Sequence, residues 1–214
     1  MANIDYKKLY KLQDSVLDII FSVQPIFYLT GGTCLSRFYK EKRYSDDLDL
    51  FTHESDKFFK VVKEIKLLLL KHFQVNEEVS SKDFVRLNIN NILQVDFVND
   101  KVIRYKETIT LDNGYIIDNY ENIFANKITA VMGRDNPKDI FDIYLIMKFF
   151  KYNLKDILEV AHQKAFFYND DLIIRLKSFP TFLLTKIKLV DKNFLDNFEL
   201  EYNKIIEKIE ENIY

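Results

Sequence analysis

The sequence predicts an α+β fold in which a mixed β-sheet flanked by helices is followed by a helical bundle. The first half of the chain contains both segments with helical apolar spacing and segments with strand-like spacing. Three strand-like runs follow one another closely between residues 73 and 98. From Asn119 onward the apolar spacing is helical. We therefore place a domain boundary near Ile117, which gives an α/β domain of residues 1–117 and a helical domain of residues 118–214. Because 48% of the residues are hydrophobic, there is ample material for buried cores.

The first elements surround a short strand that stops at a pair of glycines. Helical spacing covers Asp5 to Ser22 and, further on, about Asp56 to Lys71. Between them Ile26 to Thr30 is a β-rich run that ends at Gly31-Gly32, two of only four glycines in the chain, so we expect a tight turn. The helix after this turn should cover Thr33 to Tyr39, with Thr33 as its N-cap.

Three further strands and a series of helices complete the prediction. The strands are expected at Phe73 to Val79, Phe84 to Asn90 and Ile92 to Val98. Asn90-Asn91 separates the last two runs and has the composition of a hairpin turn. The helices are expected from Tyr120 to Met132, from Pro137 onward, and in further segments up to Tyr214.

Composition excludes several classes of protein. The 31 Lys and Arg residues are balanced by 33 Asp and Glu, so bulk charge does not support nucleic-acid binding, although a local basic face is compatible with it. Cys34 is the only cysteine, which rules out an intramolecular disulfide. Met1 to Tyr10 has no apolar signal-peptide core, and the longest apolar run, Leu67 to Leu70, is too short to cross a bilayer. We expect a cytoplasmic protein with no membrane partner.

The glycine pair and a nearby acidic segment carry the chemistry. Asp47 and Asp49 bracket Leu48, and strand alternation would send both carboxylates to one face. Their Cα atoms would lie roughly 7 Å apart, so the two side chains can converge on Mg²⁺, which prefers hard oxygen donors. The glycine pair alone, or the acidic segment alone, is typical of an ordinary loop or turn. Together, a strand, a Gly-Gly turn, a helix and an acidic strand predict phosphoryl transfer chemistry.

Further charged residues could extend this site. Asp96 lies on the predicted strand between Val95 and Phe97, where it is either a third metal-binding or base-forming carboxylate or an edge-strand acid that points into solvent. Four charged residues of the helical half are either a solvated helix face or a group that binds a triphosphate: Lys127, Arg134, Asp139 and Asp142. Asp139 and Asp142 are three residues apart and would share one helix face.

These residues resemble the AbiEii/AbiGii toxin family of nucleotidyltransferases, within the polymerase-β-like superfamily. The superfamily signature is a glycine pair with a hydroxyl residue, an Asp-x-Asp pair and a third carboxylate, which correspond to Gly31, Gly32 and Thr33, to Asp47 and Asp49, and to Asp96. The segment Lys42 to Phe51, which includes Ser45, also fits the family pattern. The family's downstream lysine and its Arg with Lys/Arg-Asp-x-x-Asp are similar to Lys127, Arg134, Asp139 and Asp142. The likeness covers roughly residues 26 to 146.

The resemblance implies a nucleotidyltransferase-type sheet and an enzyme that uses Mg²⁺ or Mn²⁺ to move a nucleoside monophosphate from an NTP to an acceptor hydroxyl. It implies RNA or tRNA as acceptor, and the toxin role of a type IV toxin–antitoxin or abortive-infection system with a cognate antitoxin. The implied catalytic residues are Asp47, Asp49, Asp96, Lys127 and Asp142, of which Asp47, Asp49 and Asp96 bind metal. The implied nucleotide-binding residues are Gly31, Gly32, Thr33, Ser45, Lys127, Arg134 and Asp139.

Two alternatives stay open at this point. The same fold can transfer a nucleotide to a small molecule, such as an aminoglycoside, or to a protein hydroxyl. The chain could also be a nucleotide-binding protein that has lost turnover, although the acidic pair that such a protein would lack is intact here. No feature of the sequence selects one of the four NTPs, because base selection depends on pocket shape.

Overall fold

The computed structural model describes residues 4–23, 25–54 and 56–213, and the chain divides into two compact units. The sheet unit comprises Met1–Cys34, Ser45–Lys101 and Thr108–Asp118. The helical unit comprises Leu35–Tyr44, Val102–Glu107 and Asn119–Tyr214. The last division lies one residue from the boundary expected from the sequence, and Tyr214 lies outside the described residues. Two short segments of the expected first domain belong to the helical unit, because Arg43 binds Asp142 and Asn119 binds the Tyr105 carbonyl.

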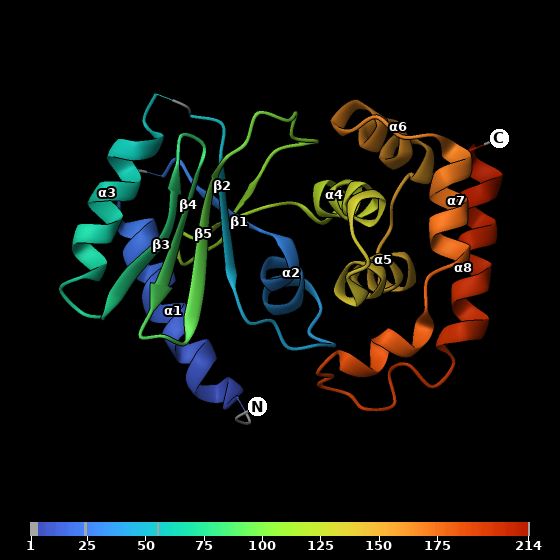
Figure 1. Ribbon diagram of the computed structural model, residues 1–214, viewed down its shortest axis with the longest axis horizontal. Coiled ribbons are helices and arrows are strands. Elements are labelled where there is room, and N and C mark those ends of the chain that lie inside the picture. Colours follow the sequence, from blue (N-terminus) through green and yellow to red (C-terminus); the bar gives the residue numbers. More distant parts are fainter. Residues whose placement is uncertain (1–3, 24, 55, 214) are drawn as a thin grey trace. The chain divides into compact units, whose positions relative to one another are not determined.

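The sheet unit contains a mixed sheet whose seven strands, counted over the described residues, follow the order β3-β4-β5-β2-β1-β7-β6 (Figure 1). The strands are β1 (Tyr28–Thr30), β2 (Leu48–Thr52), β3 (Val75–Ser81), β4 (Phe84–Ile89), β5 (Leu93–Asn99), β6 (Ile109–Thr110) and β7 (Ile116–Ile117). The β1–β7 and β2–β5 pairs are parallel and the other pairs are antiparallel. The predicted α+β class and mixed sheet are confirmed.

The predicted hairpin between β4 and β5 is present. Asn90 and Asn91 have φ values of 53° and 55°, the left-handed backbone of the two central residues of a type I′ turn, and the Ile92 N–H donates to the Ile89 carbonyl at 3.0 Å. Asn tolerates the left-handed region better than most residues, and Asn90 Oδ1 is further held by the N–H of Gln74, which lies just before β3. The strand expected from Phe73 begins instead at Val75, because the Phe73 N–H still binds the Leu69 carbonyl at the end of the preceding helix.

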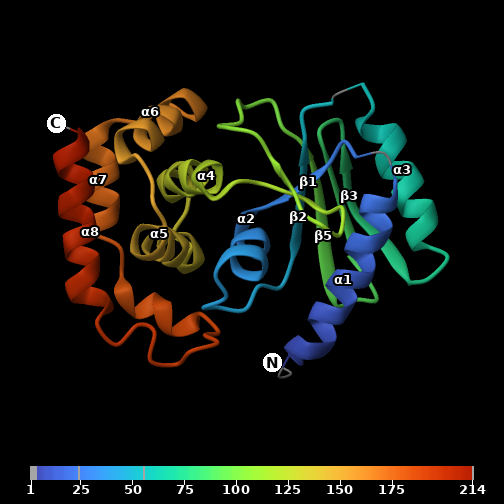
Figure 2. The ribbon, with the colours of Figure 1, turned by 180° about the vertical axis from the view of Figure 1, so that it is seen from behind.

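Two helices cover one face of the sheet, α1 (Tyr6–Ser22) and α3 (Phe58–Leu69) (Figures 1 and 2). The side chain of Asp5 caps α1 by accepting from two backbone N–H groups. The rings of Phe58 on α3 and Phe97 on β5 both contact Phe27, with centroid distances of 6.0 and 5.1 Å. Burying each such side chain stabilises the fold by about 1.5–3 kcal/mol, so this face holds the core of the sheet unit.

The helical unit confirms the helices predicted after Asn119. Its elements are α4 (Tyr120–Gly133), α5 (Pro137–Phe149), α6 (Leu154–Lys164), α7 (Asn169–Lys177), the 3₁₀ helix η2 (Thr181–Lys186) and α8 (Phe198–Ile213). Asn119, Asn136 and Asn153 cap the first three, each accepting a backbone N–H at the helix start. The α4 helix packs against α5, α6 and α7, while α7 lies along α8 (Figure 2).

The segment after the glycine pair differs from its prediction. The helix expected at Thr33 to Tyr39 begins at Gly31 as α2 (Gly31–Cys34) and continues as the π-helix η1 (Leu35–Tyr39). The prediction that Thr33 is an N-cap is therefore wrong. Gly31 has a φ of 71°, which turns the chain directly into the helix, and the Thr33 hydroxyl is used elsewhere. Among the described residues, no helix combines the length and the apolar character needed to cross a bilayer.

Candidate active site

The glycine turn and the acidic strand are in direct contact. Thr30, the last residue of β1, pairs with Asp49 on the antiparallel neighbour β2, so Gly31 lies beside the Asp49 side chain. A Cβ atom on Gly31 would lie only 2.4 Å from Asp49 Oδ2. Together with the φ of 71°, this contact explains why only glycine fits at position 31. The two halves of the sequence motif thus form a single structural site within the sheet unit.

The acidic pair follows the predicted alternation. Asp47 lies one residue before β2, and the burial pattern of β2 alternates so that Leu48 and Leu50 are fully buried while Asp49 is half-buried. Asp47 is also half-buried, and its carboxylate forms no hydrogen bond or ion pair with the part of the chain that the structure describes. Two carboxylates thus lie on the polar side of this strand, next to the glycine turn.

Thr33 and Ser45 join the turn to the acidic segment. Their hydroxyl oxygens are 2.8 Å apart, and the Thr33 hydroxyl also donates to the Asp47 carbonyl. Gln13 of α1 donates to the Ser45 carbonyl at 3.1 Å. Because both hydroxyl residues are buried, their observed role is to hold the loop before β2 against the turn. Their contact with a nucleotide stays a prediction.

Asp96 lies in register with the acidic pair. On β5 it pairs with Asp49 of β2 on one side and with Arg86 of β4 on the other, so β5 is an interior strand and the solvent-facing edge interpretation is wrong. Residues paired across strands share a face of the sheet. A polar row therefore crosses four neighbouring strands, made of Thr30, Asp49, Asp96 and Arg86. It lies on the face opposite to the one on which Phe97 contacts Phe27 in the core.

Arg86 holds both oxygens of Asp96. Its Nε donates to Asp96 Oδ1 at 2.8 Å and its Nη2 donates to Oδ2 at 2.7 Å, while Gln94 Nε2 donates to Oδ2 at 3.1 Å. The hydrogen bonding of Arg86 to Asp96, together with the charges of Asp96, Glu78 and Asp49, raises the pKa of Arg86. No sequence motif points to Arg86. The available signal was its place in β4, where Phe84, Arg86 and Asn88 alternate with three buried apolar residues.

Asp47 and Asp49 fit a divalent cation, whereas Asp96 does not fit as the side chains are arranged. Carboxylate oxygens are suitable ligands for Mg²⁺ and Mn²⁺. Asp49 is fixed beside the turn, and Asp47 has its carboxylate available. The oxygens of Asp96 are turned to Arg86 and Gln94. Accordingly, no group of three or more acidic, His or Cys side chains among the described residues is assembled around one point.

The other predicted site residues lie in the helical unit, where Arg43, which was not predicted, joins them in one ion cluster: Lys127, Arg134, Asp139 and Asp142. The cluster is buried except for Arg134. Lys127 Nζ lies 2.7 Å from Asp139 Oδ1 and 2.8 Å from Asp142 Oδ2. Arg43 binds both oxygens of Asp142 at 2.8 and 2.9 Å, and Arg134 Nε binds Asp139 at 2.7 Å. Asp139 and Asp142 are 0–1% exposed and Lys127 is 8% exposed, so the interpretation as a solvated helix face is wrong for these three, whereas the Arg134 side chain is 58% exposed.

The cluster keeps its members charged. Burial alone would raise the pKa of the Asp142 carboxyl, but Arg43 and Lys127 outweigh it and hold that pKa below its usual range. Lys127 and Arg134 do the same for Asp139. Burial alone would lower the pKa of Lys127, but Asp142 and Asp139 raise it. Both acids contact Lys127, so the structure makes them partners of one lysine; a nucleotide-binding role for the cluster stays a prediction.

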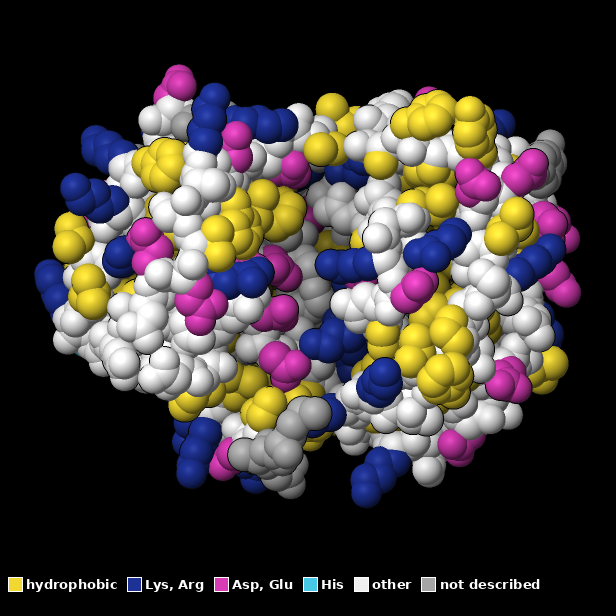
Figure 3. All heavy atoms as spheres, viewed as in Figure 1, with side chains coloured by type: hydrophobic (Ala, Val, Ile, Leu, Met, Phe, Trp, Pro, Cys, Tyr) yellow, Lys and Arg dark blue, Asp and Glu magenta, His cyan; other side chains and the backbone are white. Residues whose placement is uncertain are grey.

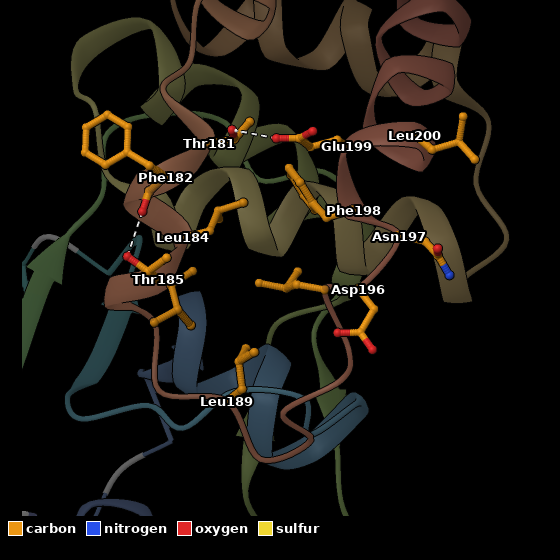
Figure 4. A pocket seen from close by; sticks show the side chains of 12 residues that line it. Thr181, Phe182, Leu184, Thr185, Leu189, Asp196, Asn197, Phe198, Glu199 and Leu200 are labelled. Carbon is orange, nitrogen blue, oxygen red and sulfur yellow. Dashed lines mark hydrogen bonds between the residues drawn. The ribbon is translucent and has the colours of Figure 1, made fainter.

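A cavity of about 740 Å³ lies within the helical unit (Figure 4). Its walls come from η2, the following loop and the start of α8, and Leu184 and Phe198 face each other across it. The charged residues that line it are Asp196 and Glu199. Since a triphosphate needs cations, this cavity does not suit one. On the face seen in Figure 3, basic, acidic and hydrophobic side chains are interspersed.

Comparison with known proteins assigns the chain. A family model described as the nucleotidyl transferase AbiEii toxin of type IV toxin–antitoxin systems matches residues 19–213. The chain belongs to this family. The AbiEii chain is therefore a nucleotidyltransferase, as its sequence motifs predict. It is 28% identical to an uncharacterized protein of Aquifex aeolicus (strain VF5) over 180 residues, which cover 82% of this chain and 84% of the relative.

Solved structures share the fold of the AbiEii chain. JHP933 from Helicobacter pylori matches with a TM-score of 0.63 at 18% identity, over 100% of this chain and 95% of that one. MenT4, a nucleotidyltransferase toxin from Mycobacterium tuberculosis H37Rv, matches with a TM-score of 0.54 at 17% identity, over 73% of this chain and 63% of that one. At these identities the likeness shows the fold, and it agrees with the mixed sheet described above.

We expect Gly31→Ala to impair nucleotidyl transfer more than it impairs folding. The new Cβ would displace the Asp49 carboxylate, and the positive φ adds strain of about 1–2 kcal/mol. Gly114→Ala is the matched control, because Gly114 has a φ of 83° with nothing within 4 Å of the added Cβ. Unfolding free energy should fall similarly in both variants, while transfer should fall at least tenfold more in Gly31→Ala. Equal activity in the two would contradict the contact with Asp49.

Proposed function

We propose that the AbiEii chain is a cytoplasmic toxin that uses Mg²⁺ or Mn²⁺ to transfer a nucleoside monophosphate from an NTP to a hydroxyl of RNA, with tRNA as the expected acceptor and a cognate antitoxin as partner. The observation that supports it most is the contact of Asp49 with the Gly31 turn. This contact unites the phosphate-binding and metal-binding parts of a nucleotidyltransferase motif.

Each part of this site has a physical role in the proposal. Asp47 and Asp49 would hold the cation, which when bound supplies positive charge to the triphosphate and the leaving pyrophosphate. The turn at Gly31 and Gly32 has no side chain, so it leaves room for phosphate oxygens beside these carboxylates. Thr33 and Ser45 would fix the turn relative to Asp47 through the hydrogen bonds already described.

Once its oxygens leave Arg86 and Gln94, Asp96 would complete the acidic site and accept the proton of the attacking hydroxyl. In the ion cluster, Lys127, Arg134, Asp139 and Asp142 remain predicted nucleotide-binding or catalytic residues. The charge of Lys127 is already balanced by Asp139 and Asp142. We therefore propose that the two acids orient Lys127 rather than leave it to move freely.

RNA is the proposed acceptor because the resemblance of the sequence motifs to this toxin family implies it. The family is described as a toxin of type IV toxin–antitoxin systems, and MenT4 is described as a nucleotidyltransferase toxin. The formal net charge of -2 does not add support, so RNA would have to be recognised by local features. A direct acceptor assay is therefore needed.

The decisive experiment incubates the purified chain with each α-³²P-labelled NTP, in Mg²⁺ or Mn²⁺, and with separate pools of total RNA, protein and aminoglycoside. We expect label to enter RNA from one preferred NTP, and we expect the Asp47→Asn variant to transfer none. Label in protein or drug instead of RNA would contradict the proposed acceptor while retaining the enzyme class. Unchanged transfer by Asp47→Asn would contradict the proposed metal site.

A further inference from the structure

Arg86 binds both oxygens of Asp96, the carboxylate that the proposed site needs as its third acid. Asp96 lies between Arg86 on β4 and Asp49 on β2, and its two oxygens are drawn to the β4 side by the fork of Arg86. Gln94 strengthens this orientation with a third hydrogen bond. Asp96 thus faces away from the acids that it would have to join around a cation.

We propose that Arg86 is a positioning residue that holds Asp96 in the cation-free enzyme, and that Asp96 exchanges the fork for the divalent cation when this cation is bound at Asp47 and Asp49. The inference rests on the proposed function, because it takes the acidic pair as the cation site. It adds a residue that the nucleotidyltransferase motif does not contain.

Arg86 balances the negative charge of two neighbouring carboxylates. Asp49 and Asp96 are in-register neighbours on adjacent strands, so their like charges repel each other when no cation is present. Arg86 supplies the missing positive charge, and its two parallel hydrogen bonds fix Asp96 in one orientation. A divalent cation at Asp47 and Asp49 makes that charge unnecessary, which favours release of Asp96.

The surroundings of Arg86 allow this release. Its side chain is 33% exposed, in contrast to the 10% of Asp96, so the guanidinium can remain in contact with solvent. Its Cζ lies 5.4 Å from the centre of the Phe84 ring, which holds the arginine without help from Asp96. Glu78 on β3 adds a further favourable negative charge for Arg86, while its own carboxylate accepts from Asn88 Nδ2 at 2.8 Å.

The test measures Mn²⁺ binding to the full chain by electron paramagnetic resonance, without NTP. The informative variant is Arg86→Lys, because lysine keeps the charge but cannot bind both oxygens in a fork. We expect Arg86→Lys to bind Mn²⁺ roughly tenfold more tightly than the wild type, equivalent to one lost charge-assisted hydrogen bond. Arg86→Met should bind more tightly still. Lys66→Met removes a different surface cation, paired with Glu77 at 2.8 Å, and should leave the affinity unchanged.

A second readout follows Arg86 itself. In a ¹⁵N–¹H spectrum, the Nε–H signal of Arg86 is identified by its absence from Arg86→Lys. Titration of the wild type with Mg²⁺ should shift this signal, because the hydrogen bond to Asp96 breaks, whereas the signal should not move in Asp49→Asn. A signal that stays in place while Mg²⁺ binds would contradict the exchange.

The outcomes separate this inference from the proposed function. If Arg86→Lys binds Mn²⁺ no more tightly than the wild type while Arg86→Met does, only the charge of Arg86 matters and the exchange is contradicted. Weaker binding by Arg86→Lys would also contradict it, since Arg86 would then support Asp96 as a ligand. By contrast, if neither Asp47→Asn nor Asp49→Asn changes the affinity for Mn²⁺, the proposed cation site itself is contradicted.

Discussion

Replacing Asp49 by Asn should reduce nucleotidyl transfer by about 10³-fold or more while leaving the fold intact. The substitution keeps the shape of the side chain but removes the charge that would hold the cation beside the Gly31 turn, and losses of this order follow when charge stabilisation of a transition state is removed. The half-buried Asp49 side chain makes a large loss of stability unexpected. Label transfer from the preferred NTP, measured with circular dichroism of the same samples, tests both parts.

Asp83→Asn provides the matched control for this experiment. Asp83 also belongs to the sheet unit, and it pairs with Lys101 at 3.3 Å on the surface, so its replacement removes the same charge without touching the polar row. We expect wild-type transfer from Asp83→Asn. If Asp49→Asn retained comparable activity, the assignment of the acidic pair would have to be abandoned.

Asp142→Ala should destabilise the chain by about 3–5 kcal/mol. Asp142 is 1% exposed and binds both Arg43 and Lys127, so its loss leaves two cations buried near Asp139 alone. The free energy of unfolding, from urea denaturation, measures the effect. Removing the pair together in Arg43→Met/Asp142→Leu should cost less than the single variant, because Lys127 keeps Asp139 as its partner.

The dependence of this loss on pH identifies its electrostatic origin. The folded-state pKa of Asp142 is lowered, so its contribution to stability is present above the unfolded pKa of about 3.9 and is lost as pH falls through the folded pKa. The difference in unfolding free energy between wild type and Asp142→Asn should therefore be large at pH 7 and shrink below about pH 4. A difference independent of pH would point to packing instead.

Asp191→Asn is the control for the ion cluster. Asp191 binds Lys42, the neighbour of Arg43, at 3.2 Å, but it is 47% exposed. Exposed pairs contribute only about 0–1 kcal/mol, because water screens them. A small effect in Asp191→Asn beside a large one in Asp142→Ala would show that burial, rather than the count of ion pairs, decides the contribution.

Periodicity and residue type predicted much of the fold. The helices at Tyr120 and Pro137 were found because capping residues and apolar spacing act within a few residues. The turn at Asn90-Asn91 was found for the same reason. The strands β6 and β7 were missed, since two residues carry no period. The start of the helix after β1 was misplaced, because a glycine with positive φ began it earlier than a capping hydroxyl would.

The site was only partly predictable. Asp47 and Asp49 were predicted to share one face of a strand, but the sequence left Asp96 as either a third site carboxylate or an edge-strand acid. The strand order decides this, because β5 lies between β4 and β2 and so brings Arg86 and Asp49 to either side of Asp96. The sequence left open whether the charged residues near Lys127 form a solvated helix face. A single sequence shows the density of charges, but it does not show that Arg43, from a distant segment, pairs with Asp142.

The sequence by itself determined the reaction class, because phosphate and cation chemistry require a glycine turn and paired carboxylates whose spacing is visible along the chain. Only the tertiary structure decided how these charges are balanced. Ion pairing depends on which strands and helices become neighbours, so Arg86 on Asp96 and Arg43 on Asp142 could not be read from local patterns. The sequence motif therefore names the acids of the site, whereas the fold supplies the cations that pair with Asp96 and Asp142.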